Sequence, residues 1–285
     1  MFKRHFMIAC VLLIILAETI GCTTPTWDTH HHRNPAQTEK EDPASINWGK
    51  TILNKEEVSS NFQIFCSEFE TTVINELFDT WRSRLERGIT PEGEEYFPEE
   101  RAAIDYYKKE LGYREINSFL RGRTDFTRST TAIISAAKLI TSGLNRMKGA
   151  RHYKDKTVYR GAYLSEELIS TYTEGHNVTE HAFTSTSIEK NIAEQFAYKK
   201  PTEGKRRVLF IIQSQTGKII TAGVEAEVLF IPFSQFKVVS KKTLDNWVII
   251  NMVEVDSQRI SRNFTDLRRV SSHSTNGLAQ SGISK

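Results

Sequence analysis

The chain has 285 residues, of which 39% are hydrophobic and 26% are charged. This composition is typical of a folded globular protein and excludes wholesale disorder, collagen and coiled coil. The formal net charge of +3 comes from the ends of the chain, since residues 257–285 alone hold five Lys or Arg and one Asp. Nucleic-acid-binding proteins carry basic residues on their folded part, so this distribution argues against nucleic acid as a partner.

The N-terminus has the pattern of an export signal. Two basic residues precede an unbroken apolar run over residues 6–16, which is too short to span a bilayer. A glycine then precedes Cys22, as in a bacterial lipoprotein processing site, although Thr19 stands where leucine is usual. We expect residues 1–22 to be a signal peptide and the mature chain to be secreted or extracellular. Cys22 is then either a lipid anchor at the membrane surface or lost with the leader.

The cysteine content excludes an internal disulfide framework. Cys10 belongs to the leader and Cys22 is lost or acylated, which leaves Cys66 alone. Its neighbours Phe65 and Phe69 favour a buried, unreactive thiol over a nucleophile.

Composition divides the rest of the chain into three parts. Residues 23–55 are polar and interrupted by prolines, which predicts a flexible linker. Residues 56–256 have the hydrophobic patterning of a folded domain, and residues 257–285 read as a disordered basic tail.

The first half of this domain, residues 56–156, is predicted to be helical. Apolar residues recur at spacings of three and four from Phe62 to Trp81, which predicts one amphipathic helix. Pro98 is typical of the first turn of a second helix, a third follows through Ile116, and a fourth covers residues 131–147.

From Thr157 the apolar period changes to two, which predicts strands across residues 157–256. The predicted strands cover residues 158–161, 182–187, 208–213, 225–231, 236–240 and 247–255. Between them, helical spacing favours a core position for Phe196. Helices followed by strands indicate an α+β fold. No GxGxxG, P-loop, CxxC pair or HExxH is present, and the eight histidines have no paired ligand spacing, so we expect no metal.

Three short segments place polar residues in predicted strands. Arg160 lies between apolar residues and precedes Gly161, which would let a ligand approach the backbone. Residues 184–187 place hydroxyls on both faces of one strand. Glu225 and Glu227 are two residues apart, so their like charges share a face, which is costly unless they meet solvent or a cationic ligand.

Together these segments resemble the arginine-specific mono-ADP-ribosyltransferases, which carry an Arg, a Ser-Thr-Ser and a Glu-x-Glu in this order. The matching residues are Arg160 with Gly161, Ser185-Thr186-Ser187, and Glu225 with Glu227. The flanking segments 113–121 and 227–233 are also similar to the ecto-enzyme branch of that family. The resemblance implies an ADP-ribosyltransferase-like core of two mixed or antiparallel sheets behind the helical part.

The resemblance also implies roles for these residues. NAD, or NADP, would be the substrate; Arg160 would contact its phosphates, and Gly161 would admit the nicotinamide amide. Ser185 would steady Glu227, with Thr186 and Ser187 also in the cofactor-binding set. Glu227 would stabilise the oxocarbenium-like ribose, and Glu225 would bind the acceptor guanidinium and take its proton.

The leading interpretation is therefore transfer of ADP-ribose from NAD to an accessible arginine of a target protein, with release of nicotinamide, by a toxin or an ecto-enzyme. An NAD glycohydrolase would use the same site with water as acceptor. A non-catalytic NAD- or protein-binding module of the same fold is a third possibility, which the presence of Arg160, Ser185 and Glu227 argues against.

Overall fold

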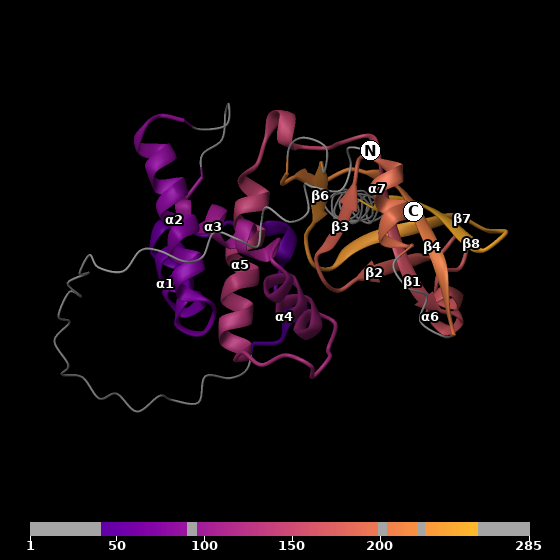
Figure 1. Cartoon of the computed structure of the whole chain (residues 1–285), viewed down its shortest axis with the longest axis horizontal. Helices are drawn as coiled ribbons and strands as arrows, with labels where there is room; N and C mark the ends of the chain where they lie inside the picture. The colour runs from indigo at the N-terminus through magenta and orange to yellow at the C-terminus, as the bar shows by residue number, and fades with distance from the viewer. Residues whose placement is uncertain (1–40, 90–95, 199–203, 222–225, 256–285) are drawn as a thin grey trace, which may run out of the picture. The chain divides into compact units, whose positions relative to one another are not determined.

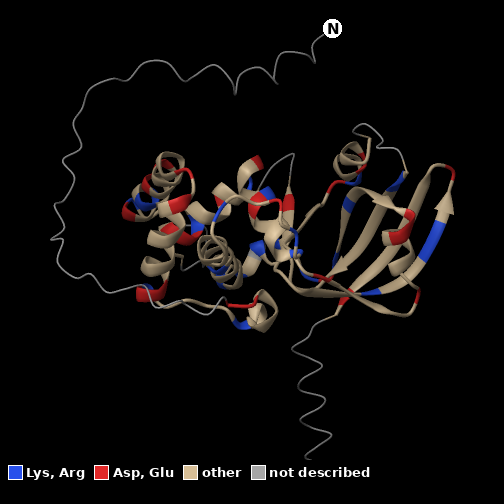
Figure 2. Cartoon of the chain, turned by 90° about the horizontal axis from the view of Figure 1, so that it is seen from below, with Lys and Arg blue, Asp and Glu red and all other residues tan. Residues whose placement is uncertain are grey.

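The computed structural model describes residues 41–89, 96–198, 204–221 and 226–255, all within one compact unit that begins at Lys40. The predicted signal peptide, most of the predicted linker and the basic tail lie outside these ranges. Within them, no helix combines the length and apolar character needed to cross a membrane. In the view of Figure 2, basic and acidic residues are interspersed over both the helices and the strands.

The first half of this unit is built from α-helices (Figure 1). They are α1 (Lys55–Glu68), α2 (Thr71–Glu86), α3 (Pro98–Tyr107), α4 (Glu110–Leu120) and α5 (Thr130–Arg146). The single helix predicted from Phe62 to Trp81 is wrong: the backbone is extended at Phe69 (φ −94°, ψ 179°), so α1 and α2 are separate. Pro98 occupies the first turn of α3, as predicted. Helix α5 is central and packs against α1, α3 and α4.

Residues 43–54, which we call the strap, pack against the helices although they fall within the predicted linker. Two short 3₁₀ turns, Pro43–Ser45 and Trp48–Lys50, bring Trp48 and Leu53 into the core, where they are 2% and 8% exposed. Asn145 Nδ2 donates to the carbonyls of Trp48 (3.0 Å) and Thr51 (2.9 Å). Burial of these apolar side chains fixes a segment whose composition alone predicts a linker.

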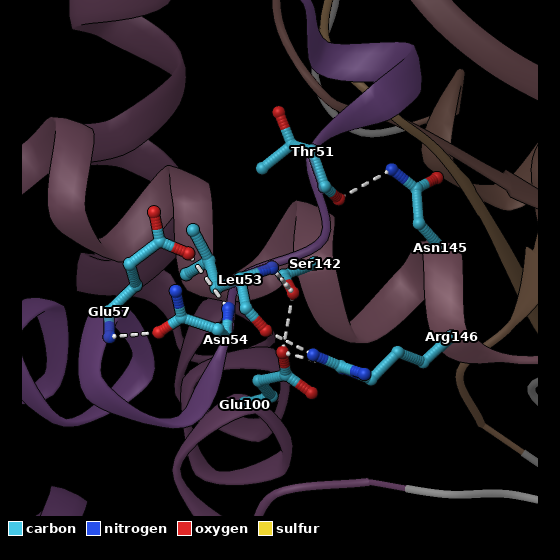
Figure 3. A network of polar contacts seen from close by, with 8 residues as sticks. All are labelled: Thr51, Leu53, Asn54, Glu57, Glu100, Ser142, Asn145 and Arg146. Atoms are coloured by element: carbon cyan, nitrogen blue, oxygen red, sulfur yellow. Dashed lines mark hydrogen bonds and ion pairs between the residues drawn. The ribbon is translucent and has the colours of Figure 1, made fainter.

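A buried polar network continues this attachment (Figure 3). The Leu53 amide donates to Ser142 Oγ (2.8 Å), and that hydroxyl donates to Glu100 Oε1 (2.5 Å). Arg146 Nε donates to the same carboxylate oxygen (3.1 Å), and its Nη2 donates to the Leu53 carbonyl. The strap is therefore held to α3 and α5 through one fully buried carboxylate.

The second half is one eight-stranded mixed sheet, and the expected division into two sheets is wrong. The strands are β1 (Lys156–Ser165), β2 (Asn177–Glu180), β3 (Thr184–Ser187), β4 (Lys205–Ser214), β5 (Lys218–Ile219), β6 (Glu227–Phe230), β7 (Ser234–Leu244) and β8 (Trp247–Val255). Their order is β2-β7-β8-β4-β1-β3-β6-β5. The sheet is continuous because β1 pairs along its length with β4 and also pairs with β3, at Tyr159 and Ser187.

Two short helices pack on this sheet. Helix α6 (Glu166–Thr171) contributes Ile169 to the apolar cluster on one face, beside Val158, Phe210 and Ile250. Helix α7 (Lys190–Phe196) packs against β1 and β3. The core position predicted for Phe196 is wrong, since its side chain is 57% exposed at the end of α7.

Candidate functional site

Strands β1, β3 and β6 bring Arg160, Ser185 and Glu227 together. Arg160 Nη1 donates to the Ser185 carbonyl (2.7 Å), and Ser185 Oγ donates to Glu227 Oε1 (2.5 Å). Ser185 is the strand partner of Leu229, and Glu227 lies two residues before it, so the serine and the carboxylate share a face as diagonal neighbours. All three residues are half-buried, which keeps their polar groups within reach of a bound molecule.

The other two residues of the Ser-Thr-Ser segment bond to the fold. Thr186 Oγ1 donates to the Val228 carbonyl (2.7 Å) and is buried between β3 and β6. Ser187 Oγ accepts from the Glu189 amide (3.0 Å) just before α7. Strand alternation places Thr186 on the opposite face, whereas Ser187 is the strand partner of Glu227 and shares its face with Ser185. Ser185 is the one whose hydroxyl donates to Glu227, since the Ser187 hydroxyl bonds to the backbone before α7.

Gly161 is explained by helix packing. A Cβ built at this position would overlap the carbonyl group of Ala193 and lie 3.1 Å from the Ala197 amide nitrogen. The absence of a side chain lets α7 approach β1 closely. The prediction that Gly161 lets a ligand approach the backbone is not tested by these contacts.

Glu225 lies outside the described residues, and β6 begins at Glu227. Between them, Ala226 is buried and its carbonyl accepts from the Ile188 amide (3.1 Å). This bond ties the start of β6 to the segment between β3 and α7.

The helical half adds two residues that sequence reasoning did not assign to the site. Asn117 Nδ2, on α4, donates to the hydroxyl of Tyr107 at the end of α3 (2.9 Å), and the Tyr107 ring packs on Phe183 (5.2 Å between centroids). Burial raises the pKa of Tyr107; the Asn117 bond and Arg160 oppose this increase, whereas Glu227 adds to it. In the sequence, Tyr107 has the helical spacing of a core residue. Asn117 lies in segment 113–121, which resembles the family.

A second arginine, Arg121, is close enough to Arg160 and Glu180 for both charges to act on it. Partial desolvation lowers the pKa of Arg121, directly after α4, and the charge of Arg160 lowers it further, while Glu180 opposes both. The Tyr172 hydroxyl donates to Glu180 Oε1 (2.7 Å). Within the described ranges neither arginine forms a salt bridge, so the site presents two mutually repelling guanidinium groups. Planar guanidinium groups suit the oxygens of a phosphate.

Two other features of the described part of the chain can be compared with this site: metal-ligand clusters and a cavity. Among the residues described, no group of three or more His, Cys, Asp or Glu is arranged to hold a metal ion. A cavity of about 820 Å³ lies between the strap and the ends of β5, β7 and β8, but its lining contains none of Arg160, Ser185 and Glu227.

Comparison with known proteins agrees with this geometry. A family model described as NAD:arginine ADP-ribosyltransferase matches residues 50–259. ADP-ribosyltransferase Vis of Vibrio splendidus (strain 12B01) is 31% identical over 156 residues, which cover 52% of this chain and 62% of Vis. The NAD(+)–protein-arginine ADP-ribosyltransferase Tre1 of Pseudomonas putida (strain GB-1) is 29% identical over 154 residues, which cover 53% of this chain and 28% of Tre1.

Solved structures show the same fold. ADP-ribosyltransferase HopU1 of Pseudomonas syringae pv. Tomato DC3000 aligns with a TM-score of 0.57 at 21% identity, over 72% of this chain and 99% of HopU1. The structure of Vis in complex with agmatine aligns with a TM-score of 0.51 at 24% identity, over 72% of this chain and 88% of Vis.

Proposed function

The chain belongs to the NAD:arginine ADP-ribosyltransferase family, and from that membership we propose that it cleaves the nicotinamide–ribose bond of NAD and transfers ADP-ribose to an arginine side chain of a target protein. The observation that carries the proposal is the hydrogen-bonded chain from Arg160 through Ser185 to Glu227. The chain matches only part of the length of its curated relatives: 62% of Vis and 28% of Tre1. The proposed activity is therefore argued from the residues of this site.

Each of the three residues has a distinct part in the proposed reaction. Arg160 binds a phosphate of NAD, which fixes the substrate beside Glu227. As nicotinamide leaves with the electrons of the broken bond, positive charge develops on the ribose, and the Glu227 carboxylate stabilises that charge. Ser185 is a positioning residue, because its hydroxyl donates to one oxygen of the Glu227 carboxylate and so fixes the orientation of that carboxylate.

The acceptor is proposed to be a guanidinium group. Such a group is cationic and a poor nucleophile, so a second carboxylate is needed to bind it and take its proton; Glu225 is proposed for that role. Vis has been crystallised with agmatine, a small guanidine compound, which supports the same acceptor chemistry here.

The test is incubation of the purified chain with radiolabelled NAD and agmatine, with nicotinamide release and ADP-ribosyl-agmatine measured separately. We expect Glu227→Gln to lose both products by about 10²-fold or more, and Glu225→Gln to lose transfer while retaining hydrolysis. Glu167→Gln on α6 is the matched control, since Glu167 is exposed and lies outside the site.

The same assay distinguishes the alternatives. Free ADP-ribose with no labelled agmatine or protein would support an NAD glycohydrolase, and no nicotinamide release from the wild-type chain would support a binding module. The presence of two glutamates two residues apart, Glu225 and Glu227, favours a cationic acceptor over water.

We further propose that the protein is exported and that Cys22 is acylated at the membrane surface. The basic start, the apolar run over residues 6–16 and the glycine before Cys22 support this proposal. Mass spectrometry of the chain recovered from bacterial cells tests it: acylated Cys22 as the new N-terminus is expected, and an uncleaved leader would contradict it.

A further inference from the structure

We propose that Glu180, held by the Tyr172 hydroxyl, binds the adenosine ribose of NAD and makes the site select NAD over NADP. The inference rests on the proposed function and assigns a specificity-determining residue to it.

Glu180 is linked to Arg160 through Tyr172 and Phe210. Phe210 on β4 is the strand partner of Arg160 on β1, so their side chains project from neighbouring positions on one face. The Tyr172 ring packs on Phe210 (5.1 Å between centroids), and its hydroxyl donates to Glu180 Oε1 (2.7 Å). Glu180 is half-buried at the end of edge strand β2, and the Tyr172 bond holds its carboxylate at the ring that packs on the strand partner of Arg160.

The charged groups of the site include two carboxylates and two arginines. Tyr107 experiences the charges of Glu227, Arg160 and Arg121, whereas Tyr172 experiences those of Glu180, Arg160 and Arg121. The charges of both arginines act on both tyrosines, whereas Glu227 acts on Tyr107 and Glu180 acts on Tyr172. Strand β1 lies between β3 and β4. Arg160 reaches Glu227 through Ser185 of β3 and is linked to Glu180 through Phe210 of β4 and Tyr172, so the two carboxylates flank it from its two neighbouring strands.

NAD has a matching order of groups: ribose hydroxyls, a diphosphate, then ribose hydroxyls. With the diphosphate on the arginine pair and the nicotinamide ribose at Glu227, the adenosine ribose lies toward Glu180. A carboxylate accepts hydrogen bonds from ribose hydroxyls, as acidic residues do in other dinucleotide sites. The same carboxylate repels the 2′-phosphate that distinguishes NADP, which carries a charge between −1.5 and −2 near neutral pH.

The competing explanation is that Glu180 only offsets the charge of Arg121. Removal of its charge would then alter NAD and NADP binding to the same extent. A selective effect on the 2′-phosphate is therefore the diagnostic result, and it needs both substrates measured in each variant.

The experiment compares kcat/KM for nicotinamide release from NAD and from NADP in the wild type, Glu180→Gln, Tyr172→Phe and the control Glu167→Gln. Glu180→Gln keeps an oxygen that accepts from Tyr172, so the fold is retained. We expect the NAD-to-NADP preference to fall by about tenfold in Glu180→Gln through a lower KM for NADP, by less in Tyr172→Phe, and not at all in Glu167→Gln.

A preference that is unchanged in Glu180→Gln, or equal changes for both substrates, would overturn the inference. That result differs from failure of the proposed function, in which the wild-type chain releases no nicotinamide from either substrate. Equilibrium binding of NAD and NADP to the Glu227→Gln variant gives a second measurement of the same preference without turnover.

Discussion

The bond between Ser185 and Glu227 carries a specific kinetic prediction. Ser185→Ala removes a hydrogen bond to a charged group, whose contribution is about 1.5–3 kcal/mol, so kcat for nicotinamide release is expected to fall about 10- to 100-fold. KM for NAD is expected to change little, because Arg160 retains its bond to the Ser185 carbonyl. Steady-state kinetics measure both constants, with Ser83→Ala on α2 as the control. An unchanged kcat would remove Ser185 from the mechanism.

Cys66 is predicted to be unreactive in the folded protein. Burial raises the pKa of its thiol to about 11, so the reactive thiolate is scarce at neutral pH and increases only as the pH approaches that value. Alkylation by iodoacetamide in a Cys10→Ser, Cys22→Ser variant is expected to be slow at pH 8 and fast after unfolding. Equal rates in the two states would show that the thiol is exposed.

At the scale of single residues, the sequence could predict the groups that lie in short motifs. Arg160, Ser185 and Glu227 were singled out because each belongs to a short segment that places polar residues in a predicted strand, and the structure brings the three together. Tyr107 and Glu180 come from α3 and β2 and reach the site only through tertiary packing, so no local pattern marks them.

At the scale of elements, Gly161 sets the distance between β1 and α7. Gly161→Ala places a Cβ against the Ala193 carbonyl, and such overpacking costs about 1–3 kcal/mol. Thermal or chemical unfolding is expected to show this loss. Gly49→Ala is the control, because a Cβ there meets only Asn47 Oδ1 at 3.8 Å. Equal stabilities for the two variants would contradict the account of Gly161.

The long elements followed from periodicity, but several boundaries did not. Helix α5 and the long strands have clear apolar periods and were located closely. The break between α1 and α2 falls where Phe69 keeps the helical spacing yet turns inward with an extended backbone, so the pattern continues across it. Strands β2 and β5 were missed because they are only four and two residues long and lie at the edges of the sheet.

At the scale of the whole molecule, the buried Glu100 network joins the strap to two helices. Glu100→Ala leaves Arg146 and Ser142 without their buried acceptor, and the expected loss is about 3 kcal/mol in the free energy of unfolding. Glu100→Gln retains an acceptor oxygen and is expected to lose much less. Urea unfolding of both variants measures the difference, and similar losses would show that the carboxylate serves only to fill space.

The pH dependence of this network has a defined sign. Burial raises the pKa of Glu100 above its ordinary value of 4.5, with Ser142 and Arg146 opposing the increase. The folded state therefore holds the proton more tightly, so the contribution of Glu100 to stability is largest below that value and declines as the pH rises through its raised pKa. Glu100→Gln is expected to lack this decline. Parallel stability curves for wild type and variant between pH 4 and 8 would contradict it.

The sequence predicted most strands of the sheet but not the order in which they pair. Alternation predicted the strands and the α+β class, but strand neighbours depend on pairings between distant residues. The single bridge between Tyr159 and Ser187 converts the two expected sheets into one, and it also sets Arg160 beside Ser185.

The most direct test of the central claim is where the ADP-ribose goes. After incubation of the chain with NAD and an arginine-containing acceptor peptide, fragmentation mass spectrometry should locate ADP-ribose on the arginine side chain, and Glu227→Gln should give none. Nicotinamide release without any modified arginine would contradict the account, as would modification that persists in Glu227→Gln.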